Sequence, residues 1–220
     1  EYCDEYSSQY SKILQDMVEF NVLQITEEDK MRAQMYAQQQ KRKKLESTVT
    51  NLDDFLKELN LKISIIPSDQ FTMPRISQLT LKTNQFNLTT KRYQEEEIQQ
   101  LTKDENILIG CASVEDKFGD NGITGVFIVK KTPKEWQIDT FLLSCRVMGR
   151  EVEKGILGYI IQKAKESNVD TIKAQFIPTQ KNKPVESFLP KCGFVQDGEY
   201  WIFSCKSEFK IPKFLTVVTK

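Results

Sequence analysis

Residues 142–157, LLSCRVMGREVEKGIL, decide how the chain is interpreted, because an apolar strand pattern changes into a helix pattern within them. The apolar run ends at Cys145, and a charged stretch containing Gly149 follows it. From Val152 onward, apolar residues recur every four positions, which predicts a helix with one buried face. A strand that leads into a helix through a glycine can present backbone amides to a phosphate group. The simpler alternative is a turn at Gly149 with Arg150 as a surface charge.

The composition of the chain excludes several classes of site and partner. Lys plus Arg and Asp plus Glu each number 31 in 220 residues, so no excess of positive charge predicts nucleic-acid binding. No histidine is present, which removes the commonest general base and the commonest metal ligand. The five cysteines are scattered, so we expect reduced thiols that lie mostly in the core, and no metal site. Catalysis would therefore rely on carboxylates, tyrosine, cysteine, lysine or backbone amides.

The beginning of the sequence and its apolar runs bear on where the protein works. The chain opens EYCDEYSSQY, without an initiator methionine or a basic-then-apolar leader, so we expect no signal peptide. No apolar run approaches the roughly 18 residues that a membrane span needs. We therefore expect a cytoplasmic protein without membrane contact, and a piece of a longer one.

Two regions differ in their sequence pattern. Residues 1–60 predict a helical segment, because apolar positions within 13–18 and 52–59 fall at helix spacing and a long polar helix lies between them. Residues 61–220 predict one α/β domain, with a mixed sheet and helices on its faces. The expected strands are 61–67, 107–114, 124–130, 136–145, 171–177 and 199–205. The expected helices are 75–85, 91–101, 152–164 and 184–191.

Two short stretches bear on the connections and edges of this sheet. Asp120-Asn121-Gly122 predicts the turn of a hairpin between strands 107–114 and 124–130. FLTVVT (214–219) fits either a further strand or a contact with a partner, and both alternatives stay open.

The predicted order of elements, β-α-α-β-β-β-α-β-α-β, is similar to that of the GNAT acyl-CoA N-acyltransferase fold. Four strings resemble the C-terminal GNAT-like region of FkbH-type proteins: SQLTLKTNQFNLTTKRY (77–93), EDKFGDNGITGV (115–126), IDTFLLSCRVMGREVE (138–153) and PTQKNKPVESFLPKCGF (178–194). Two helical strings, TEEDKMRAQMYAQQQKRKKLES (26–47) and NLDDFLKEL (51–59), resemble the segment that follows the HAD-superfamily core of those proteins. The HAD motif DxDxT is not in this sequence.

The resemblance implies a function and a set of partners. FkbH-type proteins load a glyceryl unit, derived from a bisphosphoglycerate, onto an acyl carrier protein for polyketide-type biosynthesis. The resemblance places the HAD domain outside this chain. It implies that the region present here meets the carrier protein or its phosphopantetheine arm, with CoA or acyl-CoA as the other ligand to consider.

The resemblance also implies a phosphate-binding motif, Q/R-x-x-G-x-G/A, between a strand and a helix. The matching residues are Arg146, Val147, Met148, Gly149, Arg150 and Glu151. Glu151 stands where glycine or alanine is usual, and its bulk and charge oppose a pyrophosphate. The sequence therefore favours a singly phosphorylated pantetheine arm over CoA.

A second candidate region is the amide-rich stretch at the end of the helix expected at 75–85. Amide side chains beside an aromatic ring can orient a hydroxylated acyl group by hydrogen bonds. The candidate residues are Asn84, Gln85, Phe86 and Asn87. The alternative is an ordinary helix C-terminus, at which Asn87 tolerates a left-handed conformation.

Two residues are candidates for catalysis. Asp139 lies in strand 136–145, where alternation places it on one face with Phe141, Leu143 and Cys145, and burial there would raise its pKa as a base requires. Cys145 lies just before a helix N-terminus, a setting that activates a thiol for a thioester intermediate. The alternatives are a structural carboxylate and a buried strand cysteine.

Three functions remain in competition. The first is an acyltransferase module in glyceryl–carrier protein formation, and the second is a non-catalytic docking domain for the carrier. The third is a CoA-dependent N-acetyltransferase. GNAT acetyltransferases often have a general-acid tyrosine four residues before a Gly-Phe pair, whereas this chain has Leu189 there, ahead of Gly193. Together with Glu151, Leu189 disfavours the third function.

Overall fold

A computed structural model describes residues 27–49 and 51–220, and it contains the elements expected from residue 61 onward, in the expected order. The apolar stripe within residues 13–18 lies outside the described residues. The chain divides into two compact units, Glu1–Lys44 and Leu45–Lys220. The long polar helix predicted between the two apolar stripes is α2.

The described helices and strands have the following bounds. The helices are α2 (Glu27–Thr48), α3 (Leu52–Leu59), α4 (Met73–Lys82), α5 (Glu95–Leu101), α6 (Val152–Glu166) and α7 (Phe188–Lys191), with 3₁₀ helices η2 (Cys145–Val147) and η3 (Lys183–Val185). The strands are β1 (Lys62–Pro67), β2 (Phe86–Asn87), β3 (Ile107–Asp116), β4 (Gly119–Lys131), β5 (Glu135–Leu143), β6 (Thr171–Ala174), β7 (Val195–Asp197), β8 (Tyr200–Ser204) and β9 (Thr216–Thr219).

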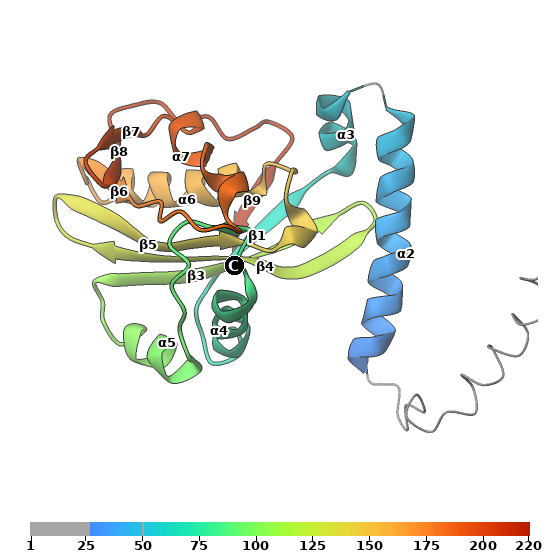
Figure 1. The fold of residues 1–220 in the computed structure, drawn as a ribbon, viewed down its shortest axis with the longest axis horizontal. Helices are drawn as coiled ribbons and strands as arrows, with labels where there is room; N and C mark the ends of the chain where they lie inside the picture. The colour runs from blue at the N-terminus through green and yellow to red at the C-terminus, as the bar shows by residue number, and fades with distance from the viewer. Residues whose placement is uncertain (1–26, 50) are drawn as a thin grey trace, which may run out of the picture. The chain divides into compact units, whose positions relative to one another are not determined.

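The strands form one mixed sheet in the order β7-β8-β6-β5-β4-β3-β1-β9, and β2 pairs with β5 beside this path. The pairs β5–β6 and β1–β9 are parallel, whereas the other pairs are antiparallel. Helices α6 and α7 cover one face, and α4 and α5 cover the other (Figure 1). This is the mixed α/β architecture that the sequence predicted. For residues 214–219, the sequence left a further strand and a partner contact as alternatives. The structure shows a strand there, the edge strand β9.

A buried apolar cluster lies on each face of the sheet. The cluster beneath α6 is the larger, and it includes the apolar stripe of that helix, from Val152 to Ala164, and the buried residues of α3. The smaller cluster joins Ile76 of α4 and Ile98 of α5 to β3, β4 and β5. Since burial of apolar area is the main stabilising term in folding, these two clusters hold the sheet between its helices.

The hairpin turn between β3 and β4 was predicted at the wrong residues. Asp116 pairs with Gly119, so the turn is made by Lys117 and Phe118, and the N–H of Phe118 donates to Asp116 Oδ1 at 3.0 Å. The predicted turn residues 120–122 instead lie inside β4, where the register with β3 shifts. There Gly122 supplies the left-handed φ of 69° that a bulge requires.

The strands β5 and β6 pair over only four residues, from Glu135↔Thr171 to Ile138↔Ala174. Beyond this point, β2 lies along β5 in place of β6, with Phe86 opposite Leu143. Neither β2 nor β7 was predicted from the sequence. We call the space between β5 and the chain that follows β6, beyond Ile138 and Ala174, the wedge.

Candidate functional site

A cleft of about 860 Å³ lies where β5 ends and the chain enters η2. Its lining residues are Arg75, Gln78, Leu79, Lys82, Thr83, Asn84, Gln85, Leu143, Ser144, Cys145, Arg146, Gln180, Lys181 and Pro184. Four of these side chains are cationic, and no carboxylate is among the lining residues that the structure describes. We call this site the cationic cleft. A low-dielectric concave surface of one charge attracts ligands of the opposite charge, so the cleft suits an anion.

Two of the cations are held in place by the start of β4. Arg75 donates from Nε and Nη2 to the carbonyl of Ile123, at 3.3 and 3.2 Å, and Arg146 Nη1 lies 3.5 Å from the carbonyl of Asn121. These carbonyls flank Gly122, at which the β4 register shifts. The bulge that was predicted as a turn therefore orients two guanidinium groups of the cleft.

The cleft brings together four of the residues that the sequence singled out. They are Asn84, Gln85, Cys145 and Arg146. Cys145 is exposed and begins η2 directly after Ser144, so the alternative of a buried strand cysteine was wrong. The Ser144 hydroxyl accepts from the backbone N–H of Arg146 at 3.5 Å and begins that short helix. The other described cysteines, 111, 192 and 205, are buried as expected.

The rest of the predicted phosphate motif is not in the cleft. Val147 is fully buried in the core, and Met148 packs against it. Arg150 is only 6% exposed and forms an ion pair with the buried Asp116, at 3.3 Å. It is therefore not the surface charge of the simpler alternative, and a buried guanidinium paired with a carboxylate is poorly placed to meet a phosphate. Gly149 has a φ of 77° and open space beside its Cα.

Two carboxyl groups lie at the start of α6. Glu151 is the N-cap, with a left-handed φ of 58°, and its side chain forms an ion pair with Lys154 at 2.5 Å. Burial raises the pKa of Glu153, and the nearby Glu151 carboxylate raises it further. These groups surround the positive end of the helix dipole with acidic side chains of the chain itself. The cationic side chains suited to bind an anion therefore line the cationic cleft and do not lie at the N-terminus of α6.

The candidate residues Phe86 and Asn87 also turn away from the cleft. The Phe86 ring packs against both Phe141 and Phe188, with centroid distances of 6.3 and 5.3 Å. Asn87 is fully buried, and it donates to the carbonyl of Thr83 at 3.2 Å. Its oxygen accepts from the backbone N–H of Thr90 at 2.9 Å. Asn87 therefore holds together the backbone around it, but the alternative of a left-handed helix end at Asn87 was wrong. Helix α4 ends at Lys82, Asn87 lies in β2, and the residue with a left-handed φ is Thr90.

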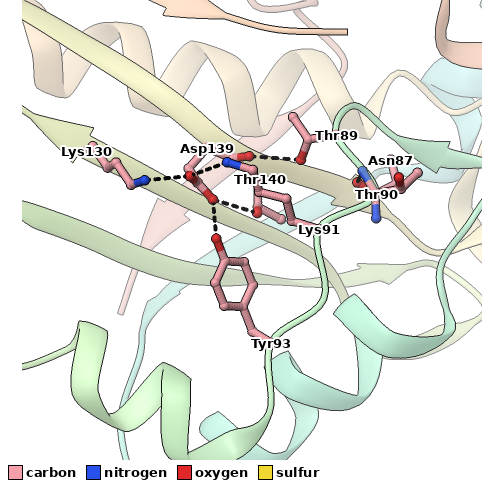
Figure 2. Close-up of polar contacts among 8 residues, drawn as sticks. All are labelled: Asn87, Thr89, Thr90, Lys91, Tyr93, Lys130, Asp139 and Thr140. Carbon is pink, nitrogen blue, oxygen red and sulfur yellow. Dashed lines mark hydrogen bonds and ion pairs between the residues drawn. The ribbon is translucent and has the colours of Figure 1, made fainter. Parts of the chain in front are cut away.

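Asp139 is the buried centre of a polar network (Figure 2). Its Oδ1 accepts from Lys91 at 2.7 Å and from Lys130 at 2.9 Å, and its Oδ2 accepts from the Tyr93 hydroxyl at 2.5 Å. The Thr140 hydroxyl lies 3.2 Å from the same Oδ2. Both carboxylate oxygens are therefore engaged, and the Asp139 side chain is fully buried.

A β-bulge overturns the predicted orientation of Asp139. Ile138 pairs with Val129 and Thr140 pairs with Ile128, so Asp139 is an extra residue in β5. It contacts Lys130, which alternates with Ile128 on the α4–α5 face of β4, whereas Phe141 and Leu143 belong to the α6 cluster. The extra residue breaks the alternation on which the prediction relied.

The expected rise in the pKa of Asp139 was also wrong. Burial raises the pKa, but the hydrogen bonds from Lys91, Tyr93 and Lys130 together outweigh burial and lower it to about 2. The pKa of Tyr93 is raised, first by burial and then by its hydrogen bond to the Asp139 carboxylate. At neutral pH the pair is a carboxylate and a neutral phenol. These protonation states suit a structural role in which Asp139 holds Lys91, Tyr93 and Lys130 together. A general base needs a pKa closer to 7.

Known structures share this fold, although no family model matches the sequence and no curated protein matches it. The ribosomal-protein-S18-alanine N-acetyltransferase from Escherichia coli is similar with a TM-score of 0.52 at 9% identity, covering 66% of this chain and 96% of that one. An acetyltransferase of the GNAT family from Staphylococcus aureus Mu50 has a TM-score of 0.50 at 14% identity, covering 66% of this chain and 99% of that one. The chain has a GNAT-type fold. At sequence identities of 9% and 14%, the comparison with these two structures shows a shared fold and nothing more.

Sequence reasoning missed three of the four cations of the cleft. Arg75 and Lys82 are seven residues apart on α4, with Gln78 between them, so they share one helix face. That polar face was a signal in the sequence. Lys181 has no such signal, because a loop brings it to the site. Among the described residues no helix could cross a membrane, and no cluster of acidic and cysteine side chains could hold a metal ion.

Proposed function

We propose that the chain is an acyl-transfer module of FkbH type, which moves a glyceryl or similar short acyl unit onto the phosphopantetheine arm of an acyl carrier protein. The observation that carries the proposal is the cationic cleft with an exposed thiol, Cys145, on a GNAT-type fold. Arg146 and the other cations would hold the phosphate of the arm. Asn84 and Gln85 would orient the acyl hydroxyl groups.

The proposed chemistry is transfer of an acyl group between thiols. The Cys145 thiolate attacks the carbonyl carbon of an incoming thioester, and the bond from that carbon to the donor sulfur breaks. The donor leaves as a thiolate and takes up the proton that Cys145 released, so no net proton is consumed. The thiolate of the carrier arm then repeats the exchange and releases Cys145. This scheme leaves Asp139, the other catalytic candidate, to support the loop beside β5.

A second candidate is a docking domain that binds the carrier while an adjoining HAD domain outside this chain does the chemistry. The observation that favours it is the altered start of α6, where Glu151 and the buried Arg150–Asp116 pair replace an open phosphate cradle. The Escherichia coli protein is named as an N-acetyltransferase, but we disfavour a CoA-dependent N-acetyltransferase activity for this chain. Leu189, which stands at the general-acid position implied by the resemblance, is buried in the core.

The first experiment separates transfer from docking. The chain is incubated with a glyceryl-loaded acyl carrier protein, and intact masses are followed with time. Transfer predicts a glyceryl adduct on the chain that is lost in Cys145→Ala, while Cys145→Ala still binds the carrier. Binding without any adduct leaves the docking domain as the function. Tight binding of acetyl-CoA with acetyl transfer to an amine would contradict both.

The second experiment tests the cleft itself. Lys82→Ala and Arg146→Ala should each weaken binding of phosphopantetheine roughly tenfold, because each removes a charge-assisted contact to the phosphate. Lys210→Ala is the matched control, because Lys210 is exposed, pairs with Glu208, and does not line the cleft. Titration calorimetry at two salt concentrations measures the affinities. Equal losses in all three variants would remove the cleft as the phosphate site.

A further inference from the structure

The wedge between β5 and the chain after β6 is occupied by residues 86–89, which we call the insert. On one side the insert lies along β5, where Asn87 is opposite Leu142 and the N–H of Leu88 donates to the carbonyl of Phe141 at 3.1 Å. On the other side the carbonyl of Leu88 accepts from the N–H of Ile177 at 2.8 Å. The insert therefore bridges two segments that would otherwise stand apart.

Buried side chains fasten the insert at several points. Asn182 is fully buried, and its Nδ2 donates to the carbonyls of Asn87 and Ile177, at 3.0 and 2.9 Å. The Thr89 hydroxyl donates to the carbonyl of Asp139 at 2.9 Å (Figure 2). Every residue of the insert is buried. Removing the insert from the wedge would leave these buried polar groups without partners, which is costly.

The segment that follows the insert is clamped as well. Thr90 has a φ of 53°, which a β-branched residue rarely adopts, and the surrounding contacts hold it there. Lys91 and Tyr93 then reach the buried carboxylate of Asp139. The bulge in β5 thus presents one carboxylate that anchors the segment directly after the insert. Contacts from β5 and from Asn182 therefore fix the insert, and the Asp139 carboxylate fixes the residues that directly follow it.

An open strand edge binds any extended chain that carries amide groups, whether a peptide or a pantetheine arm. In this molecule the insert already makes those hydrogen bonds. We infer that the insert permanently closes the wedge to extended ligands, so that a thiol arm reaches Cys145 only through the cationic cleft. The identity of the arm rests on the proposed function, whereas the closure of the wedge does not.

This arrangement determines which ligands bind. Without strand-like pairing to β5, the amide groups of a pantetheine arm contribute little, and the phosphate contributes most of the affinity. Pantetheine that lacks the phosphate should therefore bind at least tenfold more weakly than phosphopantetheine, and the affinity for phosphopantetheine should fall steeply with salt. Equal affinity for the two molecules would overturn the inference, because it would mean that the arm itself is recognised.

The test of closure is amide hydrogen exchange on the whole chain, with and without phosphopantetheine. The N–H groups of Leu88 and Ile177 should exchange as slowly as the central amides of β3 and β4, and adding the ligand should leave them unchanged. Rapid exchange in the ligand-free chain, or loss of protection on ligand binding, would show that the insert moves out of the wedge.

The two proposals fail in different ways. If phosphopantetheine does not bind while Leu88 and Ile177 stay protected, the proposed function fails and the closure stands. If it binds and the protection is lost, the closure fails and the function stands. Asn182→Ala should speed exchange at Leu88 and Ile177 by roughly tenfold or more, whereas the exposed control Asn106→Ala should not. If Asn182→Ala does not fold, the exchange of the unaltered chain still decides.

Discussion

Asp139 shows how much the surroundings of one residue decide its role. The sequence correctly drew attention to it, as a carboxylate inside an apolar strand. Its environment was not predictable, because Lys91, Tyr93 and Lys130 come from a loop and a neighbouring strand. Nothing in the local pattern indicated the extra residue in β5 either. Burial was foreseen, but the three donors that reverse its effect on the pKa were not.

The pKa of Asp139 predicts how stability depends on pH. Because the folded-state pKa lies near 2, below the ordinary value of 3.8, the carboxylate stabilises the fold fully above about pH 4. That contribution, on the order of 2 kcal/mol, is lost as the pH falls from about 4 toward 2. Asp139→Asn should lower the free energy of unfolding at pH 7 by about that amount, and its stability should change less over this pH range. Urea unfolding at a series of pH values measures both.

The control for this prediction is Asp197→Asn, because Asp197 is exposed in β7. It should change the free energy of unfolding by less than about 0.5 kcal/mol at every pH. If Asp139→Asn and the unaltered chain lose stability in parallel between pH 4 and 2, Asp139 does not titrate with a lowered pKa.

Helix α6 is the element that the sequence predicted best. Its apolar positions, its glycine-bearing approach and its place after a strand were all visible in residues 142–164. The short strands β2 and β7 were invisible, because two or three residues carry no periodicity. Their existence depends on partners far along the chain: β2 pairs with β5, and Asn182 fastens it. The hairpin turn was predicted wrongly at residues 120–122, because a glycine with a left-handed φ, such as Gly122, fits a β-bulge as well as a hairpin turn.

Close packing of α6 predicts the effect of a single methyl group. A Cβ at Gly155 would lie 2.5 Å from Cδ1 of Ile63, which is fully buried in β1. Overpacking should destabilise Gly155→Ala by about 2–3 kcal/mol. The gain of about 1 kcal/mol in helix propensity offsets part of this loss, so we expect a net destabilisation of about 1–2 kcal/mol. Thermal unfolding measures the sum. Gln162→Ala, on the exposed side of the same helix, is the control, and equal stability of the two variants would contradict the close contact.

For the molecule as a whole, the sequence predicted the order of elements and the mixed sheet, and the cleft only in part. A cleft depends on which loop ends meet, so Cys145 and Asn84 could be named separately but Lys181 could not. The phosphate motif failed as a unit for the same reason. Its Arg146 turns into the cleft, whereas its Arg150 turns into the interior toward Asp116.

The distribution of thiols gives a test of the whole fold. Cys145 is exposed, whereas burial raises the pKa of Cys111 and of Cys192 to about 12, and also raises that of Cys205. Among the four cysteines that the structure describes, a maleimide added to the folded chain should modify Cys145 first, and Cys111, Cys192 and Cys205 only as fast as the molecule unfolds. Peptide masses identify the labelled sites, and mild denaturant should erase the difference. Labelling of Cys192 as fast as Cys145 would show that the core is open.

The pairing of β1 with β9 has a consequence for how the protein is made. These strands lie side by side in the sheet, yet they are the first and last of the described strands to be synthesised. Joining segments so distant along the chain is slow, because the intervening loop loses entropy before the contact forms. Until Thr216–Thr219 is synthesised, β1 has β3 on one side and an open edge on the other. Until β9 pairs with it, the open edge of β1 can pair with other extended chains.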